Sequence, residues 1–291
     1  MWRRASTARK PGSATGAYDR DMPSPSSTHR RRTLHAEELE RWLLDALRVR
    51  PGDTVLELAG GTGELCLRLA ERVRPGGAAI CSDLDPQRVA EAARRAEEQG
   101  ANDVSPRVID MHRIDLPDAS VDGVLCRWGY MFAVPTEVAL GETFRVLRAG
   151  RRIALSVWGD AHRNPWMSLV DEAFAAEGHT VRADRSAVGR MFSLAEADRL
   201  RALLTGAGFE DIVLEEIPVD FVYPDSDAHW HEEGRYPGGP FTNYLSSLEG
   251  SQVGAVRARL DASLAPFRLP SGEYRVPGLA LNATARRGSR R

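Results

Sequence analysis

The sequence predicts an α/β protein, and three observations point to that class. Residues 55–65 begin as a buried apolar strand, pass through a tight glycine turn and start a helix. After this unit, short apolar runs typical of strands alternate with amphipathic helical segments. The chain has 291 residues, of which 42% are hydrophobic, so it can bury a sizeable core. We expect one large α/β domain, or one such domain with an inserted cap.

Charge and composition exclude several classes of partner. The formal net charge of −2 gives no electrostatic case for nucleic acid or an acidic membrane surface. No apolar run approaches the roughly 20 residues that span a bilayer, and the Arg-rich start continues into Pro, Gly and Ser instead of an apolar signal segment. The cysteines, Cys66, Cys81 and Cys126, lack metal-ligand spacing. We expect a cytoplasmic protein with reduced, inert thiols, no metal, and a disordered basic tail over residues 1–33.

Periodicity and turn residues define the first elements. An amphipathic helix starts at about residue 36 and ends before a Pro-Gly-Asp turn that leads into the first strand. A helix over Glu64–Arg72 follows the glycine turn, and the apolar run Ala78–Ser82 forms the second strand. Asp85 precedes Pro86, which predicts a helix N-cap with proline at the first helical position.

The glycine turn indicates a nucleotide-containing cofactor. Small residues let the backbone approach a ligand closely, and the helix that follows presents free N–H groups to an anion such as a carboxylate. A dinucleotide fingerprint needs a third small residue, but that position is Cys66 counted from Gly61 and Glu64 counted from Ala59. Glu57, at the end of the strand, suits a ligand with a cationic end. S-adenosylmethionine carries an ammonium, a sulfonium and a carboxylate, but no phosphate.

At these residues the chain resembles class I S-adenosylmethionine-dependent methyltransferases, whose first motif reads acid-x-G-x-G-x-G. The stretch Glu57-Leu-Ala-Gly-Gly-Thr-Gly63 matches it with Ala59 in place of the first glycine, as in the ubiquinone and menaquinone C-methyltransferases. The resemblance implies a Rossmann-like, seven-stranded, mostly parallel sheet with an antiparallel last strand, helices on both faces, and a cap between strands six and seven. It also implies S-adenosyl-L-methionine as the cofactor, with contacts from Glu57, Ala59, Gly60, Gly61 and Gly63.

The end of the second strand supplies a further cofactor contact. Asp83 lies 20 residues beyond Gly63, where a carboxylate can accept both ribose hydroxyls, and Leu84 lies beside it. A turn or capping aspartate is the alternative interpretation of Asp83. A nicotinamide cofactor would share this acid, so Asp83 supports a ribose without choosing the cofactor.

The next block favours S-adenosylmethionine. Asp110 matches the family acid that accepts a hydrogen bond from the adenine amino group, and Met111 matches the residue beside the ring. The stretch Asp118-Ala-Ser-Val-Asp122 matches the family step D-x-S-F-D that leads into strand four. By the same resemblance, Arg127 and Trp128 close strand four beside the methionine part of the cofactor. A simple turn aspartate is the alternative for Asp110.

Later segments complete the expected domain. A helix over Thr136–Leu147 leads into Arg145–Gly150, which the family writes R-V-L-K-P-G-G before strand five. Ser193–Glu196 has the pattern of a capping box that opens a helix. Ile212–Phe221 is expected as strand six and Val276–Thr284 as strand seven. The expected divisions are a tail over residues 1–33, a methyltransferase domain over 34–221 and 271–287, an inserted substrate cap over 222–270, and a C-terminal tail over 288–291.

Two segments, residues 159–191 and 224–270, exceed a minimal methyltransferase and should lie over the carboxyl ends of the strands, where open α/β sheets bind ligands. Their aromatic residues suggest an apolar or aromatic small-molecule substrate, and the alternative is that these rings pack the cap onto the sheet. His162, His229 and His231 are candidates for a general base, each with a surface histidine as the alternative. The candidate substrate contacts are Tyr130, Met131, Trp158, Trp166, Phe192 and Trp230.

We therefore expect an S-adenosylmethionine-dependent methyltransferase that acts on a hydrophobic small molecule, plausibly a bacterial secondary metabolite, with O-methylation favoured over N- and C-methylation. A quinone-ring C-methyltransferase and a non-catalytic cofactor-binding scaffold are the alternatives. A nicotinamide oxidoreductase is disfavoured by the missing third glycine. The expected partner is a small molecule, without nucleic acid or membrane, and the chain is expected to be a monomer or homodimer.

Overall fold

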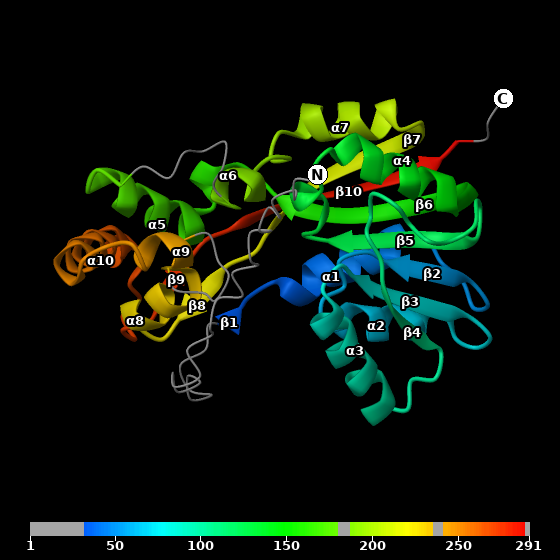
Figure 1. Ribbon diagram of the computed structural model, residues 1–291, viewed down its shortest axis with the longest axis horizontal. Helices are drawn as coiled ribbons and strands as arrows, with labels where there is room; N and C mark the ends of the chain where they lie inside the picture. Colours follow the sequence, from blue (N-terminus) through cyan, green and yellow to red (C-terminus); the bar gives the residue numbers. More distant parts are fainter. Residues whose placement is uncertain (1–31, 180–186, 235–240, 289–291) are drawn as a thin grey trace, which may run out of the picture.

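The computed structural model describes residues 32–179, 187–234 and 241–288, and its centre is a seven-stranded sheet of order β4-β3-β2-β5-β6-β10-β7 (Figure 1). The predicted α/β class and the antiparallel last strand are confirmed. β4 (Val104–Val108), β3 (Ala78–Asp83), β2 (Thr54–Glu57), β5 (Val121–Arg127) and β6 (Leu147–Trp158) run parallel, and β10 (Leu279–Arg287) runs antiparallel to both β6 and β7 (Phe209–Pro218).

Helices cover both faces of this sheet. α1 (Ala36–Ala46), α2 (Glu64–Val73) and α3 (Pro86–Glu98) pack along one face, and α4 (Thr136–Val146) and α7 (Ala197–Gly206) pack along the other (Figure 1). Strands buried on both faces are apolar along their length instead of alternating. The central strands β2 and β5 show this pattern, with Val55, Leu56, Val124 and Leu125 all fully buried.

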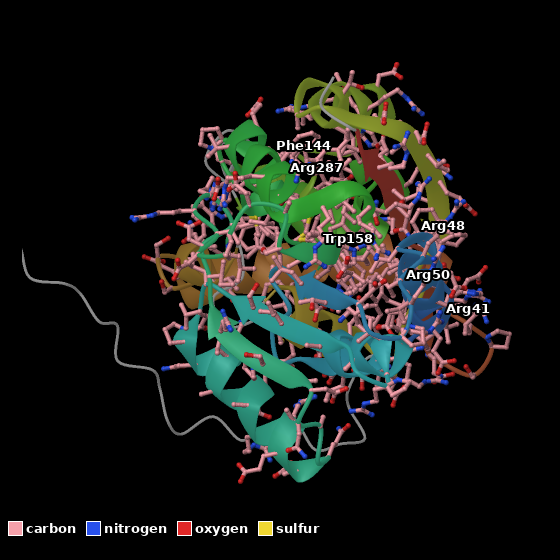
Figure 2. The ribbon with its side chains drawn as sticks, turned by 90° about the vertical axis from the view of Figure 1, so that its right-hand side faces the viewer. Arg41, Arg48, Arg50, Phe144, Trp158 and Arg287 are labelled. Atoms are coloured by element: carbon pink, nitrogen blue, oxygen red, sulfur yellow. The ribbon has the colours of Figure 1, made fainter. Side chains whose placement is uncertain are left out.

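The far edge of the sheet is closed by an aromatic contact. Figure 2 shows Arg287, at the end of β10, beside Phe144 of α4. The guanidinium carbon of Arg287 lies 4.8 Å from the Phe144 ring centroid, and that ring meets Phe209 edge-on at 5.3 Å. A cation over a ring face and an edge-to-face ring pair are both favourable geometries. They fasten α4 to the ends of β7 and β10.

A second, three-stranded sheet of order β1-β8-β9 corrects three sequence predictions. Phe221 and Val276 were expected to end strand six and begin strand seven, but they belong to β8 (Phe221–Tyr223) and β9 (Tyr274–Val276). Arg32–Thr33, expected in the disordered tail, forms β1 and pairs with β8. The rest of that predicted tail, residues 1–31, lies outside the described residues, as do 289–291 of the C-terminal tail.

Backbone crowding explains why the last strand starts later than predicted. A Cβ on Gly278 would lie 2.6 Å from the Val219 carbonyl oxygen and 3.1 Å from both the Trp166 and Phe221 rings. Only glycine fits where β8 and β9 leave the main sheet, and Pro277 before it cannot donate to a ladder. The chain therefore changes sheets at this point, and β10 begins at Leu279.

Local capping agrees with one sequence prediction and contradicts another. The Asp85 carboxylate accepts a hydrogen bond from the Gln87 N–H at 2.9 Å, so the N-cap of α3 is confirmed. The capping box at Ser193 is wrong, because α7 begins after Glu196 and the Ser193 hydroxyl donates to the Met131 carbonyl at 3.0 Å. That bond ties the loop before α7 to the turn after β5.

A cap stands at the carboxyl ends of the parallel strands, on the left of Figure 1. The cap consists of α5 (Pro165–Ala176) together with residues 226–234 and 241–264. The two parts come from both of the segments expected there, and they pack closely: the Phe174 and Phe241 rings stack at 5.0 Å. In the described part of the chain, no helix is long and apolar enough to cross a bilayer. The remaining elements are η2 (Tyr130–Phe132), η3 (Ala161–Arg163), α6 (Ala187–Met191), α8 (Ser226–His229), the π-helical turn η4 (Trp230–Gly234), α9 (Thr242–Leu245), α10 (Gly250–Leu264) and η5 (Ala265–Phe267).

Candidate functional site

The turn after β2 holds its backbone in left-handed conformations. The φ angles are 53° at Ala59, 57° at Gly61 and 85° at Gly63. Glycine adopts such angles freely, whereas other residues are disfavoured there by about 1–2 kcal/mol. The Gly61 N–H donates to the Asp83 carboxylate at 2.9 Å, which fastens the turn to the end of β3. The N-terminus of α2 is thereby held at the rim of a cavity.

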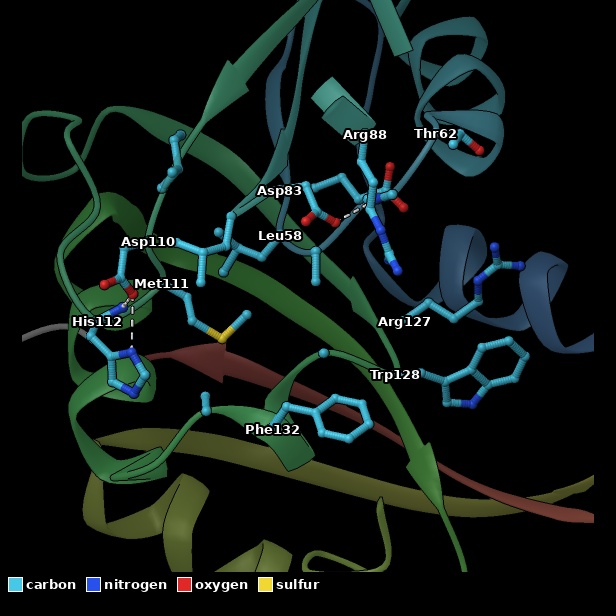
Figure 3. Close-up of a pocket in the computed structure, with 18 of the residues that line it drawn as sticks. Leu58, Thr62, Asp83, Arg88, Asp110, Met111, His112, Arg127, Trp128 and Phe132 are labelled. Carbon is cyan, nitrogen blue, oxygen red and sulfur yellow. Dashed lines mark hydrogen bonds and ion pairs between the residues drawn. The ribbon is translucent and has the colours of Figure 1, made fainter. Parts of the chain in front are cut away.

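This cavity has a volume of about 700 Å³ and opens at the carboxyl ends of β2, β3 and β5 (Figure 3). Pockets for small molecules and cofactors usually measure about 300–1,000 Å³. The expected cofactor contacts line it with one exception, Gly63, whose Cβ position would meet the Ala92 methyl at 3.0 Å. The contacts on the lining are Glu57, Ala59, Gly60, Gly61, Asp83, Leu84, Asp110, Met111, Arg127 and Trp128.

One end of the cavity is formed by the loop after β4. The Asp110 carboxylate accepts a hydrogen bond from the His112 backbone N–H at 2.8 Å, and the His112 ring lies 3.0 Å from the same oxygen. These two contacts lower the pKa of Asp110 below its ordinary value, so this exposed carboxylate is charged and available to a donor. Figure 3 shows the pair side by side at the edge of the cavity.

Apolar side chains face the same end. Leu84 is 66% exposed and Phe132 is 46% exposed, with half-buried Met111 between the acidic loop and the Phe132 ring (Figure 3). Exposed apolar side chains grouped around a cavity mark a place where a ligand covers them. A flat heterocycle with an amino group suits this end, because the apolar residues can hold its faces while Asp110 accepts from its edge.

The floor of the cavity carries a buried acid. Glu57 is 2% exposed, and its Oε2 atom has no hydrogen-bond partner among the described residues. The pKa of Glu57 is raised to about 8, mainly by burial and also by the nearby charges of Glu40 and Asp83, whereas Arg127 lowers it. An unpartnered buried carboxyl is costly to ionise. A cation entering the cavity would relieve that cost.

Arg127 links the cavity to α1. Its guanidinium forms an ion pair with Glu40, and Glu40 also pairs with Arg68 of α2. The Arg127 guanidinium carbon lies 5.1 Å from the centroid of the Trp128 ring. The first helix is thus fastened across the end of β5 by charged contacts that are largely shielded from solvent.

Trp128 begins a series of aromatic contacts that runs from the cavity into the cap. It has a φ of 58°, and its ring stacks on Trp158 at 4.6 Å with an interplanar angle of 14°. Trp158 meets Trp166 of α5 at 4.9 Å, and Trp166 meets Phe221 at 4.9 Å. The Trp128 ring on the cavity lining is therefore backed by a row of buried aromatic rings that reaches α5.

These features fit S-adenosyl-L-methionine. Asp83 lies where a carboxylate can accept ribose hydroxyls, and Asp110 lies with Met111 and Phe132 where an adenine can bind. The open N-terminus of α2 suits a carboxylate, and the unpartnered oxygen of Glu57 suits a cation. A pyrophosphate is a poorer fit, because four acids line the same cavity: Glu57, Glu64, Asp83 and Asp110.

Comparison with known proteins decides the family. Residues 55–150 match the family model described as a methyltransferase domain. The chain carries a class I S-adenosylmethionine-dependent methyltransferase domain. An arsenite methyltransferase of Halobacterium salinarum is 29% identical over 162 residues, which are 56% of this chain and 38% of that protein. A ubiquinone/menaquinone biosynthesis C-methyltransferase of Ectopseudomonas mendocina is 26% identical over 185 residues, 60% of this chain and 71% of its own.

A solved structure shows the same fold. The phosphoethanolamine N-methyltransferase 2 of Haemonchus contortus, solved with S-adenosyl-L-methionine, has a TM-score of 0.55 and 16% identity, and the match covers 87% of this chain and 53% of that one. At this identity the likeness bears on the fold alone. The match spans less than half of the length of the arsenite methyltransferase.

The expected substrate residues lie behind the cavity wall of the methyltransferase domain. Tyr130, Met131, Trp158, Trp166 and Trp230 are all buried in the core, and Phe192 is half-buried. The rings of Trp158 and Trp166 pack in series behind Trp128. The Tyr130 hydroxyl forms a hydrogen bond of 2.6 Å with the Thr143 hydroxyl. Burial in the core is the alternative that the sequence left open for these aromatic residues.

The candidate bases do not line the cavity. His162 and His231 are exposed, and His229 is fully buried with its Nε2 2.9 Å from the Trp166 carbonyl oxygen. The lining also includes side chains that the sequence did not assign to the cofactor site, among them Arg88 and His112. His112 lies two residues after Asp110, and a short-range aspartate turn of this kind was the signal that could have found it.

Proposed function

We propose that this protein transfers the methyl group of S-adenosyl-L-methionine to a hydrophobic, aromatic small molecule. The observation that carries the substrate class is the Trp128 ring on the lining of the cavity, which is backed by the buried rings of Trp158 and Trp166. A planar apolar acceptor that lies against Trp128 would share one surface with the cofactor cavity. Bacterial secondary metabolism offers many molecules of this kind.

The protein's own residues bind, orient and exclude water. Asp83 and Asp110 would hold the ribose and the adenine, and the turn at Gly61 would hold the methionine carboxylate. The bound cofactor supplies an electrophilic methyl group on a sulfonium. Holding an acceptor in line with that group in a water-poor pocket can contribute about 7–11 kcal/mol of the barrier reduction.

We favour oxygen as the acceptor atom. The positions of the titratable side chains on the cavity lining indicate which kind of hydroxyl group could be methylated. The acids and the histidine on the cavity lining lie at the cofactor turn, at the end of β3 and at the adenine end. Beside Trp128, Arg127 is a cation paired with Glu40, and Gly129, Phe132 and Ala133 carry no titratable group. Among the described cavity residues, none is therefore placed to remove a proton near Trp128. We infer a phenolic hydroxyl, with a pKa near 10, which can lose its proton to water.

The test is an incubation with isotopically labelled cofactor and a panel of acceptors, read by product mass. The panel contains phenols, matched anilines, and matched arenes without a heteroatom. We expect labelled products from phenols that carry an apolar ring system. Asp83→Asn serves as the control that weakens the cofactor site, and Arg163→Ala, which removes an exposed ion pair with Glu216, serves as the surface control. Cofactor binding without transfer to any acceptor would instead support a non-catalytic scaffold.

Quinone-ring C-methylation is the second candidate. The turn Leu58–Gly63 and the similarity to the C-methyltransferase of Ectopseudomonas mendocina favour it. A demethylated quinone precursor added to the same panel separates the two candidates. The labelled methyl group would then be attached to a ring carbon and not to an oxygen. Arsenite methylation has no such support, since Cys66, Cys81 and Cys126 are buried and do not line the cavity.

A further inference from the structure

Glu57 lies under the glycine turn in a space that only a glycine leaves open. A Cβ on Gly60 would approach the Glu57 Oε2 atom to 2.8 Å and the Cys81 sulfur to 3.1 Å. The turn therefore covers the carboxyl group directly, with no side chain between them. Any ligand that lies on the turn is separated from this carboxyl by the backbone alone.

The charges around Glu57 leave its own charge poorly compensated. Arg127 of β5 is the cation that lowers the pKa of Glu57 most, but its guanidinium also forms an ion pair with Glu40 of α1. Asp83 of β3 adds a second negative charge. From α2, the Cys66 backbone N–H donates a hydrogen bond to the Glu57 carboxyl, while the buried Cys81 thiol lies on the β3 side.

Burial is the strongest influence in this balance. It raises the pKa of Glu57 to about 8, so at neutral pH most molecules of the free protein hold a proton on this carboxyl. The unpartnered Oε2 atom is a position where that proton can lie. A protonated carboxyl is the state in which a buried, unpaired acid costs least.

We propose that Glu57 is neutral in the free protein and ionises when an S-adenosyl ligand that carries a cationic ammonium group enters the cavity, so that ligand binding releases one proton to solvent. This inference rests on the proposed cofactor. The neutral carboxyl and the cation become a carboxylate and a cation, and the proton passes to the buffer. The attraction between the new pair offsets the cost of the buried charge.

Two consequences follow. A neutral nucleoside cannot drive the ionisation, so Glu57 distinguishes ligands by charge as well as by shape. The affinity for a cationic ligand should increase with pH, by up to about tenfold per pH unit below pH 8, because one proton is released. Above pH 8 the free protein is already ionised and the effect ends.

Calorimetric titration in two buffers of different ionisation enthalpy at pH 6.5 measures the protons released. At this pH the α-amino group of the ligand, with an ordinary pKa of about 7.7–8.0, is almost fully charged. The wild-type protein should release about one proton per bound S-adenosylhomocysteine, which carries the ammonium group. It should release none with methylthioadenosine, a neutral analogue that lacks the amino-acid part.

Two variants separate this role from a general loss of binding. Glu57→Gln should bind S-adenosylhomocysteine without proton release, whereas Asp110→Asn, at the other end of the cavity, should bind it more weakly but release the same proton. If the wild type binds S-adenosylhomocysteine without releasing a proton, the inference is overturned and the proposed cofactor is not. The same holds if Glu57→Gln releases as many protons as the wild type. Failure of the wild type to bind any S-adenosyl ligand overturns both. If Glu57→Gln does not fold, the comparison of charged and neutral ligands on the wild type still decides the matter.

Discussion

Replacing Gly63 by alanine should destabilise the protein and weaken its cofactor site. The φ of 85° at Gly63 is disfavoured for alanine by about 1–2 kcal/mol, and the new methyl would lie 3.0 Å from the Ala92 methyl of α3. Overpacking of this kind typically costs about 1–3 kcal/mol, so we expect a total loss of about 2–5 kcal/mol in the free energy of unfolding. The turn must also shift, which should weaken binding of S-adenosylhomocysteine roughly tenfold, or ~1.4 kcal/mol.

Two matched glycines isolate the two contributions. Gly52 has a φ of 90° but no atom within 4 Å of its Cβ position, so Gly52→Ala should cost only the backbone term of about 1–2 kcal/mol. Gly141 lies inside α4 without a left-handed φ and with an open Cβ position, so Gly141→Ala should stabilise by about 0.5–1 kcal/mol. Urea unfolding of the three variants and calorimetric titration give the values. Equal losses for Gly63→Ala and Gly52→Ala would refute the contact argument.

Three further predictions concern charges. Asp83→Asn should weaken S-adenosylhomocysteine binding by about 1.5–3 kcal/mol, which is what a hydrogen bond to a charged group usually contributes. Asp85→Asn is the control: it keeps a side-chain acceptor at the α3 N-cap and should leave the affinity nearly unchanged in the same titration. In urea unfolding, Glu57→Gln should be more stable than the wild type at pH 8, on the order of 3 kcal/mol, and this difference should shrink toward pH 5. The reason is that the pKa of Glu57 is raised from 4.5 to about 8 in the folded protein, so the carboxyl contributes stability below pH 4.5 and loses that contribution as the pH rises. A difference that does not vary with pH would contradict that pKa. Arg163→Ala should change the free energy of unfolding by less than about 1 kcal/mol, because its ion pair with Glu216 is more than half exposed at both ends.

Local patterns in the sequence were sufficient to predict the strand-turn-helix unit and the N-cap of α3. Both depend on contacts between near neighbours, such as the Asp85 carboxylate and the Gln87 N–H. The capping box at Ser193 has the same kind of pattern, yet its hydroxyl found a partner 62 residues away in the Met131 carbonyl. A short motif cannot exclude a competing long-range acceptor.

The glycine turn and the acids at the strand ends were identified by spacing, and the family that they resemble agrees with the comparisons. The positions of the substrate residues and candidate bases were not accessible in this way. Trp158 was expected beside the substrate and His229 as a candidate base, but the Trp158 ring is buried behind Trp128 and His229 is buried against the Trp166 carbonyl. Which face of an element meets a cavity depends on how the cap packs.

The sequence by itself determined the alternation of strands and helices in the seven-stranded domain, the cofactor turn and the acids around it, because each follows from residue types at short spacing along the chain. Only the tertiary structure decided that Gly278 forces the chain into a second sheet, that Arg127 is held by Glu40, and that Glu57 is buried without a partner for one oxygen. These are properties of segments that are distant in sequence and meet in space. Burial and electrostatic balance arise from that meeting, and they give Glu57 a proton that no local pattern predicts.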